Sequence, residues 1–259
     1  MFLNHLIFVA QTIAWRSCRH AHTAELQACP ESGKWAGCLG LQAISYRWWD
    51  AVVYRFVLRE NIAIFEGLLE VETAESVRRT VQDMLVAVKR ELAILEAREF
   101  GVLNRPWPVA MAHGSVEKAS IAHAFQIQFE SSPSPYLMLD PGPGLHIIDI
   151  NDAYAQATMT RRAVVAGRPI FEVFPDNPDD PRADGVSNLY ASLRAAAASG
   201  RPHAMPIQRY DIRDPDGRFV ERYWRPFNTP VLDSEGRLAY LLHHAEAVTE
   251  FDVARSERE

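Results

Sequence analysis

The cysteines are the residues whose spacing would most directly indicate chemistry. All three, Cys18, Cys29 and Cys38, lie near the amino terminus of the 259-residue chain. Their number is odd and no Cys-x-x-Cys pair occurs, so the sequence predicts neither a disulfide framework nor a zinc site. Free thiols are typical of a reducing compartment, and we therefore expect a cytoplasmic protein.

An acidic, proline-rich segment at residues 176–181 is the next candidate site. It reads Asp-Asn-Pro-Asp-Asp-Pro, and carboxylates are the ligands that Ca²⁺ and Mg²⁺ prefer. The segment lacks the ligand spacing of an EF-hand, however, and Asp, Asn and Pro are ordinary turn formers. We therefore predict a loop and no metal site.

Motifs for catalysis are missing from the sequence. It contains no Gly-x-Ser-x-Gly, His-Glu-x-x-His or protein-kinase signature, and no glycine-rich nucleotide loop. We predict no catalytic residues and no enzyme activity. The net charge of -6 argues against a nucleic-acid surface, which would need a clustered basic face. Met1–Trp15 is apolar but too short to span a bilayer and lacks the basic region of a secretory signal, so we expect no membrane association; the alternative is a helix that touches the membrane surface.

The elements that must position any site begin near residue 50. Apolar residues have no regular spacing in residues 1–49, and we expect this segment to be a poorly ordered leader. From Asp50 onward, apolar residues recur at three- and four-residue steps, which predicts helix. A break at residues 72–75 separates this first helix from a second one. We expect Thr73 to cap the second helix and Gly101 to end it. The sequence therefore predicts an α-helical hairpin arm over residues 50–100.

The second helix of this arm carries a short heptad seam. Its members are Val81, Leu85, Val88, Leu92 and Leu95. Two alternatives exist for it: the hairpin buries its own stripe, or the exposed remainder pairs with a second copy of the chain. We favour a homodimer through these five residues.

The second half of the chain predicts an α+β domain. After a linker with a short helix at 101–122, residues 123–251 form the domain and 252–259 a tail. The predicted elements are strands 136–140 and 145–150, helix 152–158 capped by Asn151, helix 185–199 closed by Gly200, and strands 205–214, 219–231 and 238–248. This order can fold into one five-stranded antiparallel sheet with helices on one face.

Three stretches of this domain resemble a PAS sensor domain. Residues 167–178 read Gly-Arg-Pro-Ile-Phe-Glu-Val-Phe-Pro-Asp-Asn-Pro, residues 221–230 read Glu-Arg-Tyr-Trp-Arg-Pro-Phe-Asn-Thr-Pro, and residues 151–154 read Asn-Asp-Ala-Tyr. They are most similar to the PAS domains of bacterial two-component sensor histidine kinases. The resemblance implies a sensory function in signal transduction and leaves the ligand open.

The resemblance also implies a pocket between the sheet and its helices. Each candidate pocket residue has the alternative of being an ordinary core residue. The candidates for ligand binding are Tyr154, Phe171, Phe174, Leu189, Leu193, Tyr210, Trp224 and His243. Tyr223 and Trp224 are adjacent on a strand and must point to opposite faces, and the sequence does not decide which of them faces the pocket.

Two cofactors used by PAS domains can be checked against the sequence. Flavin photosensors of this class need a cysteine in the domain, and no cysteine follows Cys38. Haem-binding relatives typically offer a histidine from the long helix, and residues 185–200 contain none. The cofactor, if any, is therefore unknown.

The end of the domain departs from the family pattern. PAS domains usually close their last strand on Asp-Ile/Val-Thr, and this chain has Ala247, Val248 and Thr249 there. We expect a non-catalytic sensor that binds a small ligand or a partner, such as a kinase or a response regulator, and relays binding by conformational change. The alternatives are a ligand-free interaction and dimerisation module, a sensor histidine kinase truncated before its kinase domain, or, more remotely, a small-molecule enzyme in the same cavity.

Overall fold

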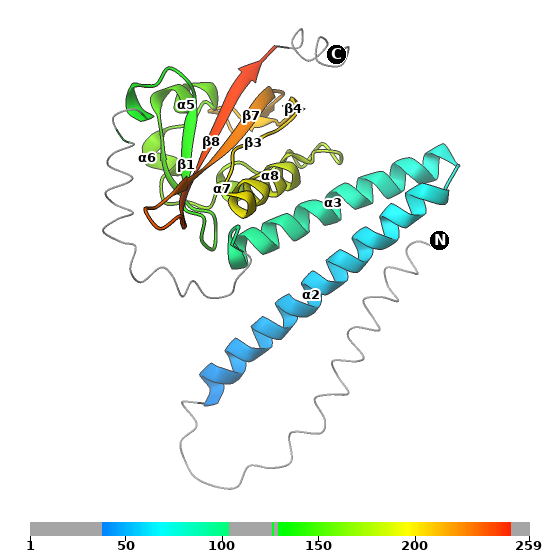
Figure 1. The fold of residues 1–259 in the computed structure, drawn as a ribbon. Helices are drawn as coiled ribbons and strands as arrows, with labels where there is room; N and C mark the ends of the chain where they lie inside the picture. Colours follow the sequence, from blue (N-terminus) through cyan, green and yellow to red (C-terminus); the bar gives the residue numbers. More distant parts are fainter. Residues whose placement is uncertain (1–37, 104–125, 127–128, 250–259) are drawn as a thin grey trace. The chain divides into compact units, whose positions relative to one another are not determined.

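The helical arm is the first element of the computed structural model, which describes residues 38–103, 126 and 129–249 (Figure 1). Helix α2 spans Cys38–Val71 and helix α3 spans Glu75–Phe100. A three-residue turn joins them into a helical hairpin, as the sequence predicts. Helix α2 begins at Cys38 rather than near Asp50. The remainder of the predicted leader, the predicted tail and most of the predicted linker lie outside the described residues.

The turn of the hairpin is held by polar contacts that differ from those expected. The Arg78 guanidinium donates to the carbonyl oxygens of Leu69 and Glu72, at 2.6 and 2.9 Å, and so satisfies the end of α2. Helix α3 is capped by Ala74, whose backbone N–H donates to the Glu72 carboxylate at 2.7 Å. The prediction that Thr73 caps α3 was therefore wrong, because the N-cap position is Ala74 and no side chain caps the helix.

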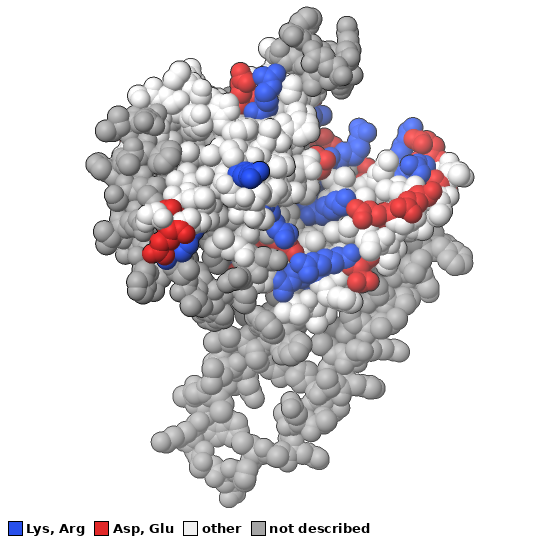
Figure 2. Space-filling model, in the orientation of Figure 1, with Lys and Arg blue, Asp and Glu red and all other residues white. Residues whose placement is uncertain are grey.

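Charged side chains of both signs lie close together along the arm. On the face shown in Figure 2, lysine and arginine side chains gather along α3 beside acidic ones, whereas the surface of the following domain is largely uncharged. Arg79 pairs with Glu75, and Lys89 pairs with Glu66 of α2, each at 2.8 Å. These exposed pairs contribute little stability, about 0 to 1 kcal/mol each.

Gly101 ends α3 as predicted, and its backbone conformation admits only glycine. It has φ of 62° and ψ of -132°, and its N–H donates to the Ala97 carbonyl. A Cβ atom at this position would lie 2.2 Å from the carbonyl oxygens of both Pro141 and Gly142. The end of α3 therefore packs directly on the turn between the first two strands.

Replacing Gly101 by alanine is expected to lower the free energy of unfolding by about 3 kcal/mol, because strain at positive φ adds to a backbone clash. The control is Gly236→Ala. Gly236 also has positive φ, 76°, but a Cβ atom added there would meet no heavy atom within 4 Å, so about 1 kcal/mol is expected. Urea unfolding of both variants measures the difference, and equal losses would show that the contact with the turn carries no energy.

The domain after the arm is built on one antiparallel sheet. Its strands are β1 (Tyr136–Leu139), β2 (Ile147–Ile150), β3 (His203–Ala204), β4 (Gln208–Arg209), β7 (Tyr223–Leu232) and β8 (Leu238–Val248). The order across the sheet is β2-β1-β8-β7-β3, and β4 pairs with β7 beside β3. Because β3 and β4 share one edge position, the sheet is five strands wide, as predicted.

The edge of the sheet is more broken than the sequence analysis expected. The predicted strand 205–214 is divided among β3, β4 and β5 (Ile212–Arg213). Pro206 lies between the first two and lacks the N–H that a continuous ladder would use. Strand β5 instead pairs with β6 (Phe219–Val220) in a separate two-stranded ladder, so the predicted strand 219–231 is also divided.

Helices cover one face of the sheet and enclose the core. They are α5 (Asp152–Ala157), α6 (Arg162–Val165), α7 (Ile170–Val173) and α8 (Gly185–Ser199). Helix α3 runs beside α8 (Figure 1). Leu137 and Leu139 of β1 are fully buried toward these helices, while Met138 between them packs against Phe129 and Tyr240 on the opposite face. This alternation follows from the two-residue period of a strand.

No helix in the part of the chain that the structure describes is both long enough and apolar enough to cross a membrane.

Candidate ligand-binding site

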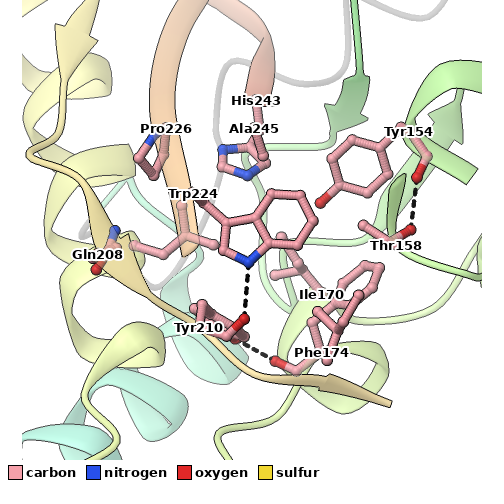
Figure 3. Close-up of a pocket in the computed structure, with 12 residues that line it drawn as sticks. Tyr154, Thr158, Ile170, Phe174, Gln208, Tyr210, Trp224, Pro226, His243 and Ala245 are labelled. Carbon is pink, nitrogen blue, oxygen red and sulfur yellow. Dashed lines mark hydrogen bonds between the residues drawn. The ribbon is translucent and has the colours of Figure 1, made fainter. Parts of the chain in front are cut away.

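A cavity lies between β7 and β8 of the sheet and helices α5, α7 and α8. Its volume is about 40 Å³. Most of its wall is aromatic or aliphatic, and none of the described residues that line it is charged (Figure 3). The lining residues are Tyr154, Thr158, Ile170, Phe174, Leu189, Gln208, Tyr210, Ile212, Trp224, Pro226, His243 and Ala245. The site is therefore suited to an uncharged ligand.

Trp224 is the residue of the Tyr223–Trp224 pair that faces the cavity. Its side chain is 4% exposed, and its indole N–H donates to the Tyr210 carbonyl oxygen at 2.8 Å. The Tyr210 hydroxyl in turn donates to the Phe174 carbonyl oxygen at 2.5 Å. These two bonds hold the wall formed by the segment before β5 against α7 (Figure 3).

His243 supplies the polar part of the sheet wall. It is 4% exposed on β8, and its Nδ1 lies 2.8 Å from Oδ1 of Asn228 on the paired strand β7. Asn228 Nδ2 donates to the Ser192 hydroxyl of α8 at 2.7 Å. The Ser192 hydroxyl lies 2.8 Å from Nδ1 of the exposed His203. A chain of hydrogen bonds thus connects the cavity to the surface.

Burial shifts the pKa of the three titratable groups at the cavity so that each stays uncharged, and it raises the pKa of the Tyr210 hydroxyl well above its ordinary value. Burial, and secondarily the nearby His244, lowers the pKa of His243 to about 3. Burial alone raises the pKa of the Tyr154 hydroxyl. Because a charged form of any of these groups would lose its hydration, the cavity is electrically neutral at physiological pH.

Six of the eight predicted pocket residues line this cavity: Tyr154, Phe174, Leu189, Tyr210, Trp224 and His243. The other two lie in the adjacent core. Phe171 packs edge-on against Tyr190, with ring centroids 6.4 Å apart, and Leu193 is fully buried. That the six residues bind a ligand stays a prediction.

The sequence analysis missed six lining residues and the polar chain behind His243. The missed lining residues are Thr158, Ile170, Gln208, Ile212, Pro226 and Ala245. A signal was present for Asn228, because the strand period places it on the same face as Trp224 and Pro226. An asparagine on the inward face of a strand must find hydrogen-bond partners.

The acidic loop after α7 is held by arginine side chains. Asp176 is buried, accepts from Arg90 Nε at 2.7 Å, and accepts from the Val186 backbone N–H at 3.0 Å. Burial raises the pKa of Asp176, against these bonds. Arg209 binds Asp211 through two bonds of 2.8 Å and thereby lowers its pKa. Within the described residues, no three His, Cys, Asp or Glu side chains are grouped to hold a metal ion.

The predicted dimerisation seam lies on α3. Val81 is buried in the single chain, while the other four members are half-buried. Their part in an interface stays a prediction. The four half-buried members of the seam are Leu85, Val88, Leu92 and Leu95.

A family model matches the second half of the chain. Residues 129–253 match the family described as PAS fold. No curated protein matches the chain. A LOV protein of Rhodobacter sphaeroides is 14% identical over 49% of this chain and 67% of its own, with a TM-score of 0.39.

Two further solved structures are similar at low identity. A PAS domain from Colwellia psychrerythraea is 13% identical over 50% of this chain and 98% of its own, with a TM-score of 0.38. The PAS domain of Bordetella pertussis BvgS is 20% identical over 54% of this chain and 95% of its own, with a TM-score of 0.36. On the family match and the strand order, residues 129–253 have the PAS fold, which the helical hairpin of α2 and α3 precedes in the sequence.

Proposed function

We propose that the protein is a non-catalytic sensor of bacterial signal transduction, in which a small ligand in the PAS cavity changes the packing of the domain against helix α3. In this proposal the ligand shifts a population between two packings because it binds one of them better. The observation that carries the proposal is the ion pair between Arg90 and Asp176, which joins α3 to the segment directly after Phe174 of the cavity wall.

The connection from the cavity to α3 is short. Phe174 lines the cavity, and its carbonyl oxygen accepts the Tyr210 hydroxyl. Two residues further along the chain, the side chain of Asp176 is 2% exposed and pairs with Arg90. The Arg90 guanidinium also donates to the Ala183 carbonyl. A displacement of the cavity wall by a ligand therefore moves groups that Arg90 contacts directly.

Further contacts fix the carboxyl-terminal half of α3 on α8. The Tyr190 hydroxyl donates to the Gly101 carbonyl at 2.9 Å, and Arg194 pairs with Glu96 at 3.0 Å. Ala93 and Ala97 are buried in the same core as the cavity walls. Leu189, which lines the cavity, lies on α8 one position before Tyr190. Helix α8 thus offers a second path from ligand to arm.

The arm is a better candidate for output than the end of β8. At Ala247, where PAS domains usually carry an aspartate, the chain lacks a carboxylate that could accept backbone N–H bonds or pair with arginine. Helix α3, by contrast, takes part in two ion pairs with buried carboxylates, Glu96 on the helix itself and Asp176 in the domain. This difference favours relay through α3.

Filling the cavity covalently is expected to mimic a ligand. In Ala245→Leu, the larger side chain adds volume at a buried cavity position and displaces the wall, because interiors resist overpacking. We expect amide exchange in α3, over residues 92–97, to accelerate at least about fivefold relative to β1, as followed by hydrogen–deuterium exchange. Dividing the amide exchange rates of α3 by those of β1 separates a local change in α3 from a loss of global stability.

Two control variants make this experiment decisive. Ala247→Leu places the same side chain at an exposed position of the same strand, and it should leave α3 unchanged. Arg90→Ala removes the path through Asp176 and leaves the path through α8, so adding Ala245→Leu to it should accelerate α3 exchange less than Ala245→Leu does alone. An Ala245→Leu variant whose α3 exchanges like that of the unmodified protein would overturn the relay.

The remaining parts of the proposal concern assembly and partners. We propose a cytoplasmic homodimer that pairs through the exposed part of the α3 seam and acts on a kinase or response regulator of a two-component system. Val77, near the start of α3, is 38% exposed and extends the apolar surface of the seam. Native mass spectrometry of the purified protein, together with its visible spectrum, would report both the oligomeric state and any bound ligand.

A further inference from the structure

Two buried polar atoms face the cavity without a hydrogen-bond partner from the described part of the chain. They are Nε2 of His243 and the hydroxyl oxygen of Tyr154, each on a residue that is 4% exposed. Every fully enclosed side-chain nitrogen or oxygen among the described residues has a partner. These two atoms are therefore open to the cavity itself, and an unpaired polar atom in an apolar site favours a ligand that can satisfy it.

The hydrogen-bond chain behind His243 fixes which ring nitrogen carries the proton. Asn228 Nδ2 lies 3.6 Å from the sulfur of Met205, which can only accept, and 2.7 Å from the Ser192 hydroxyl. The amide oxygen of Asn228 must then face His243 Nδ1, so Nδ1 is the donor. In a neutral imidazole the other nitrogen is an acceptor, and Nε2 therefore presents a lone pair to the cavity.

Tyr154 presents the complementary group. Figure 3 shows its hydroxyl pointing toward the centre of the cavity, between the labelled Trp224 and Thr158. Its ring stands edge-on to His243, with centroids 6.1 Å apart and an interplanar angle of 71°. The Thr158 hydroxyl donates to the backbone carbonyl oxygen of Tyr154 at 2.7 Å. Because the Tyr154 hydroxyl makes no hydrogen bond within the described part of the chain, it can donate to a ligand.

We propose that the cavity binds a small neutral alcohol, whose hydroxyl group donates to His243 Nε2 and accepts from the Tyr154 hydroxyl. A hydroxyl is the simplest group that donates and accepts at once. The apolar remainder of the ligand lies against Trp224, Phe174 and Ile212. An anion or a cation fits the cavity poorly, because none of the described lining residues carries a charge that could pair with it. This proposal rests on the proposed function, in which the cavity takes a ligand.

The size of the cavity sets the size of the alcohol. A volume of about 40 Å³ has room for about three water molecules, whereas an engineered cavity that binds benzene measures about 150 Å³. The ligand is therefore aliphatic and short, of about three or four non-hydrogen atoms. A ligand of this size binds in the millimolar range.

The test compares three probes of nearly equal size on the full-length protein. Propan-2-ol donates and accepts, acetone only accepts, and acetate is charged. In a titration followed by NMR with ¹⁵N-labelled histidine, propan-2-ol should shift the Nε2 resonance of His243. Acetone should bind about five- to tenfold more weakly, the worth of one hydrogen bond, and acetate should not bind.

Three variants locate the site. His243→Asn keeps a donor toward Asn228 but removes Nε2, and Tyr154→Phe removes only the hydroxyl. Each should weaken propan-2-ol binding about five- to tenfold. The control is His244→Asn on the other face of β8, where His244 packs against Tyr136, and it should bind as the unmodified protein does. Because the ¹⁵N spectrum of the unmodified protein reports the tautomer directly, the proposal stays testable even if a variant fails to fold.

Each contrary outcome has a distinct meaning. A proton on Nε2 rather than Nδ1, or acetone binding as tightly as propan-2-ol, would overturn the assignment of an alcohol. Unchanged binding in both His243→Asn and Tyr154→Phe would place the alcohol elsewhere and overturn it as well. None of these results touches the relay, which fails only if filling the cavity in Ala245→Leu leaves α3 unchanged.

Discussion

Replacing Asn151 by alanine is expected to lower the free energy of unfolding of the PAS domain by about 3 to 5 kcal/mol. Asn151 is 1% exposed, and its side chain connects several segments of the amino-terminal half of the PAS domain through hydrogen bonds. Its Oδ1 accepts from the backbone N–H groups of Tyr154 and Tyr136, at 2.9 and 3.0 Å. The alanine variant loses the cap of α5 and leaves these donors without a partner.

The amide group of Asn151 holds a second set of partners. Nδ2 donates to the carbonyl oxygens of Phe129, Ser132 and Ser134, at 3.1, 3.3 and 2.7 Å. One side chain therefore joins the segment before β1 to the start of α5. Because buried carbonyl groups without a partner are destabilising, these contacts account for the upper end of the expected range.

Asn151→Asp separates the two sets of partners. A carboxylate can still accept from Tyr136 and Tyr154, but its second oxygen would face three carbonyl oxygens. We expect a loss comparable to that of Asn151→Ala at pH 7, because a buried carboxylate without a donor is costly. Asn188→Ala is the control, since Asn188 is exposed and makes only a 3.2 Å contact with Gln208. Urea unfolding at fixed pH measures the free energy of unfolding of all three variants. A decrease below about 1 kcal/mol for Asn151→Ala would show that the hydrogen bonds of Asn151 do not hold these segments together.

The features that the sequence predicted best are those with local causes. Asn151 caps α5 through its own side chain, and Gly200 ends α8 in the left-handed conformation. Both are decided within a few residues of the chain, so composition and order are sufficient. The last strand, Leu238–Val248, also has the predicted bounds.

The features that the sequence did not predict depend on which partner each group meets in the fold. Thr73 was a plausible cap, yet the neighbouring Glu72 carboxylate accepts the N–H of Ala74. The division of the edge strand follows from Pro206 and from the pairing of β5 with β6, which periodicity alone does not reveal.

The candidate site shows the same limit. Aromatic residues were expected at the cavity because they dominate such walls, and six of the eight predicted residues lie there. Phe171 on α7 and Leu193 on α8 lie in the core beside the cavity, and the spacing of apolar residues does not reveal which of them on a helix meets the cavity. The chain from His243 to Ser192 spans β8, β7 and α8, so only the fold brings it together.

The buried His243 predicts how stability depends on pH. Its pKa in the folded protein is about 3, and in the unfolded chain it is about 6.5. Between these values the unfolded chain binds a proton that the folded protein does not. The stability that His243 contributes is therefore fully present above about pH 6.5 and is lost as pH falls from there toward 3.

We expect the free energy of unfolding to fall by about 2 kcal/mol between about pH 7.5 and pH 5 because of His243, at about 1.4 kcal/mol per pH unit below its unfolded pKa. Other groups contribute over the same range. Burial lowers the pKa of His244 and adds to the loss. Burial raises the pKa of Asp176, which takes up its proton more readily when folded and so opposes the loss. Comparing the unmodified protein with His243→Asn isolates the contribution of His243.

His243→Asn is the informative variant because asparagine can still donate to Asn228 and carries no titrating group. Urea unfolding at about pH 7.5, 6.5, 5.8 and 5 should give curves that diverge below pH 6.5, with His243→Asn losing about 2 kcal/mol less than the unmodified protein by pH 5. His244→Asn should keep most of the pH dependence, since His244 is only half-buried. Parallel curves for the unmodified protein and His243→Asn would mean that His243 becomes protonated inside the fold. The lone pair at Nε2, on which recognition of an alcohol depends, would then be absent in mild acid.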